Sequence, residues 1–211
     1  MTSAPPSRDA HPVWSVLTLS LAPAIGLGVG RFGYTLVLPD MRDSLGWSYS
    51  TAGFMNTVNA IGYLAGALGA AWFIRRTGVF RAVWIGTLAC VISLAICALS
   101  GNAFLFGFGR LLSGLGAAAT FVGGGTLAAT IAQSRPAQSA FLLNLFYTGP
   151  GTGLIVSGLA APFLLQFFGP GSWWIVWLAL TVISAAMMIP LMLNPIDVAA
   201  SETSSAAPVV S

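Results

Sequence analysis

Charge is the scarcest feature of this sequence. Only 6% of its 211 residues are Asp, Glu, Lys or Arg, whereas 56% are hydrophobic and the mean hydropathy is +0.87. Soluble domains carry about 25% charged residues, so the composition predicts an integral membrane protein. The net charge of +3 comes from arginines in loops and gives no indication of nucleic-acid binding.

Residue types that carry much of enzyme chemistry are absent or rare. All eight cations are arginines, so the chain lacks the lysine of a phosphate-binding Walker A loop and is not by itself an ATP-driven pump. The one histidine, His11, lies outside every apolar run, which excludes a Ser/His pair or a histidine metal site in the membrane. Cys90 and Cys97 lie about 10 Å apart along one expected helix, too far for a disulfide. We therefore expect no enzyme activity, no metal and no cofactor.

Six apolar runs account for most of the chain. Each meets or exceeds the ~17–25 residues that cross a bilayer. Because lipid leaves no backbone group without a partner, each run is predicted to be a helix. Residues 1–12 are expected to be a disordered N-terminus, and 195–211 a flexible tail or truncated central linker. The expected fold class is an all-α membrane protein with six transmembrane helices, at about Val13–Leu38, Ser50–Ile74, Val83–Leu99, Phe104–Ile131, Ser139–Phe168 and Trp173–Leu193.

Arginines in the loops predict the orientation in the membrane. If the N-terminus is cytoplasmic, five loop arginines lie inside and only Arg42, beside Asp40 and Asp43, lies outside. An even number of spans then returns the C-terminus to the cytoplasm. The five inside arginines are Arg8, Arg75, Arg76, Arg81 and Arg135.

Two further arginines fall inside apolar runs. Arg31 lies eight residues before Pro39, which is expected to end the first helix, and Arg110 lies eight residues after Asn102. Both are therefore expected about 12 Å below the outer surface. A guanidinium keeps its charge and costs at least a few kcal/mol in hydrocarbon, so each needs a partner or a water-filled cavity. Either the two arginines bind an anion, or they are structural charges bonded to helix carbonyls.

Uncharged polar side chains accompany these arginines. Asn56, Asn59 and Tyr63 are spaced i, i+3, i+7, which predicts one helix face. Together the polar groups would line a lumen for a small polar or anionic solute, unless they serve as hydrogen-bonding contacts between helices. The candidate lining residues are Arg31, Tyr34, Asn56, Asn59, Tyr63, Arg110, Asn144 and Tyr147.

Glycines predict close helix packing in the fourth and fifth runs. Small residues let helices approach each other, and each glycine in a helix costs up to ~1 kcal/mol relative to alanine, so a close neighbour is expected. We expect the two runs to form a tight pair, and Pro150 to kink the fifth. The glycines are Gly114, Gly116, Gly123–Gly125, Gly149, Gly151, Gly153 and Gly158.

Several motifs resemble the N-terminal half of a major facilitator superfamily transporter. Arg110-Leu-Leu-Ser-Gly114-Leu-Gly116 is similar to its helix 4 signature, and Gly149-Pro150-Gly151-Thr-Gly153 to its antiporter signature. Arg75-Arg76-Thr77-Gly78 occupies the place of the Asp-Arg-x-Gly-Arg loop, but Arg75 stands where the family has Asp and Val79 where it has Arg. Gly30-Arg31-Phe32-Gly33-Tyr34 with Leu38-Pro39 resembles the bacterial YbfB/YjiJ-like branch.

The resemblance implies a secondary transporter of the bacterial cytoplasmic membrane that works by alternating access. It implies a 3+3 inverted repeat, with the first and fourth helices lining a cavity, the second and fifth beside them, and the third and sixth outside. In members of that superfamily, the helix 4 arginine that Arg110 resembles often serves helix packing or proton-relay geometry. Asp40 is the one carboxylate near the apolar runs that could couple transport to protons.

Family members place the solute path between two six-helix halves. Besides lipid and a small solute, the expected partner is therefore a second half, from the same gene, a split gene or a homodimer. The alternative function is a non-transporting membrane protein, either a truncated remnant or an assembly partner.

Overall fold

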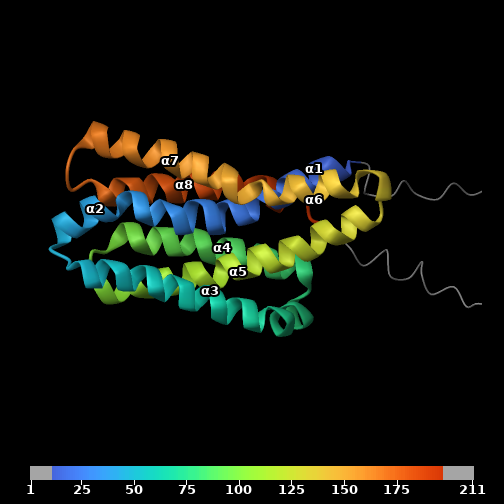
Figure 1. Cartoon of the computed structure of the whole chain (residues 1–211), viewed down its shortest axis with the longest axis horizontal. Helices are drawn as coiled ribbons and strands as arrows, with labels where there is room; N and C mark the ends of the chain where they lie inside the picture. Colours follow the sequence, from blue (N-terminus) through green and yellow to red (C-terminus); the bar gives the residue numbers. More distant parts are fainter. Residues whose placement is uncertain (1–10, 197–211) are drawn as a thin grey trace, which may run out of the picture.

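Six long helical spans make up the part of the chain that the structure describes, residues 11–196 of a computed structural model (Figure 1). Every span is long and apolar enough to cross a membrane, and the described residues contain no strand. The predicted all-helical membrane fold is confirmed. The expected disordered N-terminus and flexible tail fall almost entirely outside the described residues.

The first span is longer than predicted and is not a uniform α-helix. It consists of α1 (Pro12–Pro23), a π-helical segment η1 (Ala24–Phe32) and α2 (Gly33–Leu45). The prediction that Pro39 ends this helix was wrong, because α2 continues for six more residues, about 9 Å. It ends where Gly46 adopts φ 65° and its N–H bonds back to the Arg42 carbonyl, a left-handed C-cap that suits glycine.

The next three spans begin and end with recognisable local signals. In α3 (Tyr49–Thr77), the Ser48 side chain caps the N-terminus by accepting from the Thr51 N–H. A one-residue turn at Gly78 leads into α4 (Val79–Leu99). In α5 (Ala103–Gln133), Asn102 accepts from the N–H groups of Phe104 and Leu105. Such caps satisfy helix N–H groups that have no intrahelical partner.

The fifth span is interrupted where the glycine-proline motif predicted a kink. It comprises the 3-10 turn η2 (Pro136–Gln138), α6 (Ser139–Tyr147) and α7 (Gly149–Phe168), with Thr148 between the two α-helices. Pro150 stands in the first turn of α7, where a missing N–H is tolerated. The last span is α8 (Trp173–Leu193).

Helix α5 lies along both α3 and α4, while α7 lies against η1 and α8 against α4. This arrangement corrects the expected tight pair of the fourth and fifth spans. The glycines of α5 instead admit α3 and α4, since a Cβ on Gly114 would overlap the Asn59 carbonyl and one on Gly116 the Gly86 carbonyl. Gly124 and Gly125 meet the fifth span, at the Phe146 and Tyr147 rings of α6.

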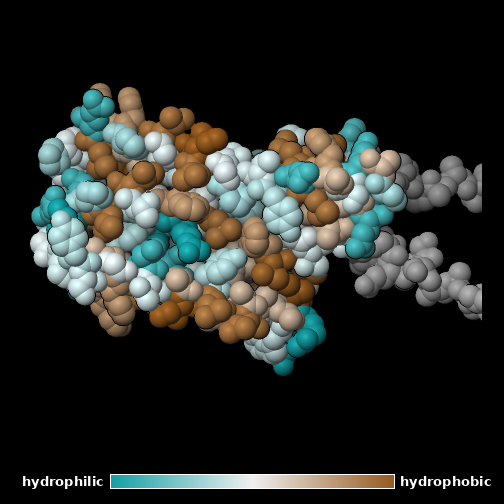
Figure 2. All heavy atoms as spheres, viewed as in Figure 1, coloured by the Kyte–Doolittle hydropathy of each residue, from teal (hydrophilic) through white to brown (hydrophobic). Residues whose placement is uncertain are grey.

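Aromatic rings fill the core on the side of α2, α5 and α8. Tyr34, Phe106 and Trp177 are fully buried, with ring centroids 5.8–6.5 Å apart. Cys90 and Cys97 are buried as free thiols, as their spacing predicted. The outward faces of α7 and α8 carry large apolar side chains, as expected for helices that meet lipid, and brown apolar residues dominate the upper margin in Figure 2.

Candidate functional site

Arg110 lies in the interior of the bundle and not on an open lumen. Its side chain is 1% exposed, and its Nη1 donates to the Gly30 carbonyl at 2.6 Å. The guanidinium carbon stands 4.5 Å from the centroid of the Tyr34 ring, a cation–π distance. Nε and Nη2 have no hydrogen-bond partner among the described residues. The charge is therefore held by one carbonyl and one aromatic face.

Two other predicted lining residues complete this buried cluster. The Tyr34 hydroxyl donates to the Ala52 carbonyl at 2.7 Å, which ties α2 to α3. The Asn59 amide donates to the Arg110 carbonyl at 3.0 Å, which ties α3 to α5. Asn59 therefore faces α5 while Asn56 of the same helix is exposed, so the predicted common face of Asn56, Asn59 and Tyr63 is divided. The close approach of α3 to α5 at Gly114 explains the division.

The π-helix η1 explains how Arg110 finds an acceptor on the first span. A π-helix bonds i to i+5 and is found most often as a short bulge at functional sites. Side chains of neighbouring helices donate to its carbonyls: Arg110 of α5 to Gly30, and Ser157 of α7 to Gly28 at 3.4 Å. Such donors make an irregular helix tolerable inside a bilayer. Nothing in the sequence period indicated this segment.

Close contact with α7 holds η1 from the other side. A Cβ on Gly28 would stand 2.5 Å from the Gly153 Cα and 2.6 Å from the Pro150 carbonyl oxygen. Gly153 of the fifth span therefore serves contact with the first span, and so does Gly149, which abuts the Ser20 carbonyl of α1.

Arg31 is not enclosed in the way that Arg110 is. Its side chain is partly exposed, and its guanidinium carbon lies 6.0 Å from the centroid of the Tyr63 ring on α3. It makes no salt bridge to any residue that the structure describes. Figure 2 shows hydrophilic residues gathered near the middle of the viewed face. Arg31 is thus partly open to the surroundings of the chain, whereas Arg110 is enclosed.

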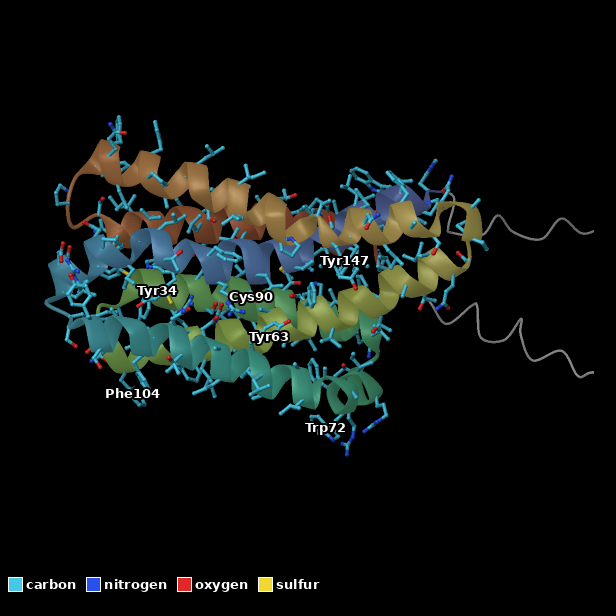
Figure 3. The ribbon with its side chains drawn as sticks, viewed as in Figure 1. Tyr34, Tyr63, Trp72, Cys90, Phe104 and Tyr147 are labelled. Atoms are coloured by element: carbon cyan, nitrogen blue, oxygen red, sulfur yellow. The ribbon has the colours of Figure 1, made fainter. Side chains whose placement is uncertain are left out.

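The remaining candidates lie on α3 and α6 and are open to the surroundings of the chain. Asn56, Asn144 and Tyr147 are exposed, and neither asparagine amide has a described hydrogen-bond partner. Tyr147 packs edge-on against Phe146, at 5.2 Å between centroids, and its hydroxyl faces Gly125 of α5. In Figure 3, Tyr63 lies near mid-length of the bundle and Tyr147 nearer the end where α6 begins. We call Arg31, Asn56, Tyr63, Asn144 and Tyr147 the candidate solute face.

Comparison with known proteins assigns this arrangement to a family. Residues 23–211 match the family described as "Uncharacterised MFS-type transporter YbfB". The chain belongs to this family. It is also 29% identical over 177 residues to "Putative transporter AraJ" of Escherichia coli (strain K12), covering 82% of this chain and 42% of that protein. The chain thus spans less than half the length of this curated relative.

The loop motif of this MFS-type chain lies at the turn between α3 and α4. Gly78 has φ 83° and ψ 154°, which side chains other than glycine rarely adopt. Arg75 and Arg76 end α3, are exposed, and form no salt bridge with a described residue. The start of α1 and this turn lie at one end of the bundle in Figure 1, opposite to the α2–α3 turn.

Asp40 has a role that the sequence reading missed. Its two carboxylate oxygens accept from the N–H groups of Gly171 at 2.7 Å and Trp173 at 2.9 Å. Asp40 of α2 therefore caps the start of α8, where Ser172 makes no side-chain cap of its own. The pair is separated by about 130 residues of chain, so no local signal could reveal it.

Proposed function

We propose that this MFS-type chain forms one half of a secondary transporter that moves a small organic anion across the bacterial inner membrane. The observation that carries the proposal is Arg31, a cation at mid-span whose side chain is neither buried nor paired with a described carboxylate. A membrane interior tolerates such a charge where it lines an aqueous path or meets a ligand.

The surroundings of Arg31 favour a carboxylate or phosphate over a neutral solute. A guanidinium presents planar paired donors that match a carboxylate, and such charge-assisted bonds are roughly twice as strong as neutral ones. Tyr63 beside it offers an aromatic face and a hydroxyl. Exposed neutral hydrogen-bonding groups on α3 and α6 suit the polar remainder of a solute in transit; these are Asn56, Asn144 and Tyr147.

A second six-helix half is part of the proposal. Exposed asparagines and an arginine in mid-span are costly against lipid, so the candidate solute face requires a polar cover. Two halves rocking about such a face would open it alternately to either side. The only carboxylates of the described spans, Asp40 and Asp43, lie at the far end of α2, so we propose that any proton site lies on the partner half.

Anion binding to the full chain in lipid nanodiscs tests the proposal. Stabilisation against heat is measured with sodium benzoate, citrate and phosphate, and with glucose as a neutral probe. We expect at least one anion to stabilise the protein, and Arg31→Gln to weaken its apparent affinity about tenfold or more through the loss of charge-assisted bonds.

The matched control is Arg42→Gln, an arginine at the exposed end of α2 that pairs with Asp43. It should leave the response unchanged. Equal responses of Arg31→Gln and the wild type would reduce Arg31 to a structural charge. If no probe stabilises the protein, the second candidate function is favoured, that of a non-transporting assembly partner. The departure of Arg75 and Val79 from the Asp-Arg-x-Gly-Arg loop motif also favours it.

A further inference from the structure

An apolar groove separates α3 from α4 on a side of the bundle away from Arg31. Both helices lie along α5 but touch each other little beyond their turn, and α5 forms the floor of the groove. The cavity has a volume of about 320 Å³, and none of its lining side chains is charged, an amide or a hydroxyl. Tyr63 instead faces Arg31 on η1, so this groove is distinct from the candidate solute face.

Small residues keep the groove open. Its walls include Ala65, Gly69 and Ala70 of α3 and Ala89 of α4, with Ala119 on the floor. A Cβ added to Gly69 would meet no atom within 4 Å, so the space above this glycine belongs to the groove. From Ala65 to Ile74 the α3 wall runs about 14 Å, a length suited to part of an extended hydrocarbon chain.

The end of the groove at the α3–α4 turn is strongly basic. Arg75 and Arg76 close α3 and Arg81 stands in the first turn of α4, all three exposed and without a salt bridge to a described residue. The Arg76 guanidinium lies 5.4 Å from the Trp72 ring, and Trp72 itself lines the groove. Figure 3 shows Trp72 projecting from the bundle near this turn.

We propose that the groove binds one acyl chain of an anionic phospholipid, whose phosphate group is held by Arg75, Arg76 and Arg81. The apolar groove would hold the acyl chain, the tryptophan at its end would lie at the membrane interface, and the three arginines would meet the headgroup. This order is the one found along a lipid molecule. Tryptophan favours the membrane interface, and basic residues at helix ends attract anionic headgroups. The two described carboxylates, Asp40 and Asp43, lie at the other end of the bundle and cannot neutralise this site.

Native mass spectrometry of the full chain in detergent tests the proposal. Phosphatidylglycerol and phosphatidylcholine with identical acyl chains are added in equal amounts, and retained lipid is counted. We expect one phosphatidylglycerol to be held in preference to phosphatidylcholine. Since each arginine near a lipid surface contributes a factor of about five, the triple variant Arg75→Gln/Arg76→Gln/Arg81→Gln should lower that preference at least tenfold.

A second variant tests the groove itself. Gly69→Phe places a ring in the open space and should abolish retention of either lipid, whereas Gly158→Phe, at an equally open glycine on α7, should not. Undiminished phosphatidylglycerol in both Gly69→Phe and the triple variant would overturn the proposal. So would a chain dimer, free of lipid, that Gly69→Phe dissociates, because the groove would then hold a second copy. The triple variant changes only exposed side chains, so it remains informative if Gly69→Phe fails to fold.

Discussion

Asp40 gives the sharpest test of how the bundle is held together at the end where α2 meets α8. Its carboxylate accepts from two backbone N–H groups, at Gly171 and Trp173, in a partly buried position. Hydrogen bonds to charged groups contribute about 1.5–3 kcal/mol each, and partial exposure places this pair at the lower end, for a total of about 3 kcal/mol. At 2–4 °C per kcal/mol for a chain of this size, Asp40→Ala should lower the melting temperature by roughly 6–12 °C.

The two thiols of the chain provide the assay. Cys90 and Cys97 are 0% and 2% exposed, so a thiol-reactive dye will label them only as the bundle unfolds. Asp40→Asn should fall between wild type and Asp40→Ala, because the amide oxygen can accept one N–H but the amide nitrogen cannot accept the other. Detergent and dye are the same for every variant.

Asp43 supplies the matched control on the same helix. It pairs with its neighbour Arg42, and its side chain is 66% exposed. Surface ion pairs contribute little, so Asp43→Ala should melt with the wild type. Equal melting temperatures for the wild type, Asp40→Ala and Asp43→Ala would refute the role of Asp40 as a cap. Equal destabilisation by the two alanine variants would show a general effect of charge that does not depend on the cap geometry.

Two further predictions concern packing inside the bundle and use the same melting assay. Gly153→Ala should destabilise the chain, since a Cβ there overlaps the Ala24 carbonyl. Gly151→Ala, where a Cβ would meet no atom within 4 Å, should be neutral or stabilising by up to ~1 kcal/mol. Equal losses of stability in the two variants would contradict the close approach of η1 and α7. Tyr34→Phe should lower the free energy of unfolding by about 1 kcal/mol, because the hydrogen bond to the Ala52 carbonyl is lost while the ring still stacks on Arg110. A loss as large as that of Tyr34→Ala would show that the ring contributes nothing beyond the hydroxyl.

The spans could be predicted because bilayer thickness constrains sequence directly. Twenty apolar residues without a charge allow few structures other than a helix, so element type and number followed from composition and run length. The ends of the spans follow from other signals. Polar residues after Pro39 suggest a loop, namely Asp40, Arg42 and Ser44. Helix α2 nevertheless continues to Leu45, since polar side chains suit helical turns that lie beyond the apolar run.

The direction in which each polar residue faces could not be predicted in the same way. Spacing identifies which residues share a face of a regular helix, but not which neighbour that face meets. Asn59 and Asn56 are three residues apart, yet one binds the Arg110 carbonyl and the other is exposed. The nine-residue π-helix compounds the problem for Arg31, since the α-helical period no longer applies between Ala24 and Phe32.

The two intramembrane arginines have different roles that depend on each other. Arg110 is fully enclosed, and its planar guanidinium can stack on Tyr34 while donating to the Gly30 carbonyl, a combination that lysine could not reproduce. The carbonyl that it binds belongs to the residue immediately before Arg31. The two positive charges repel each other, which favours an outward position for the Arg31 side chain. A solute anion at Arg31 would lie in the field of both charges, so the buried arginine would strengthen binding at a site that it does not touch.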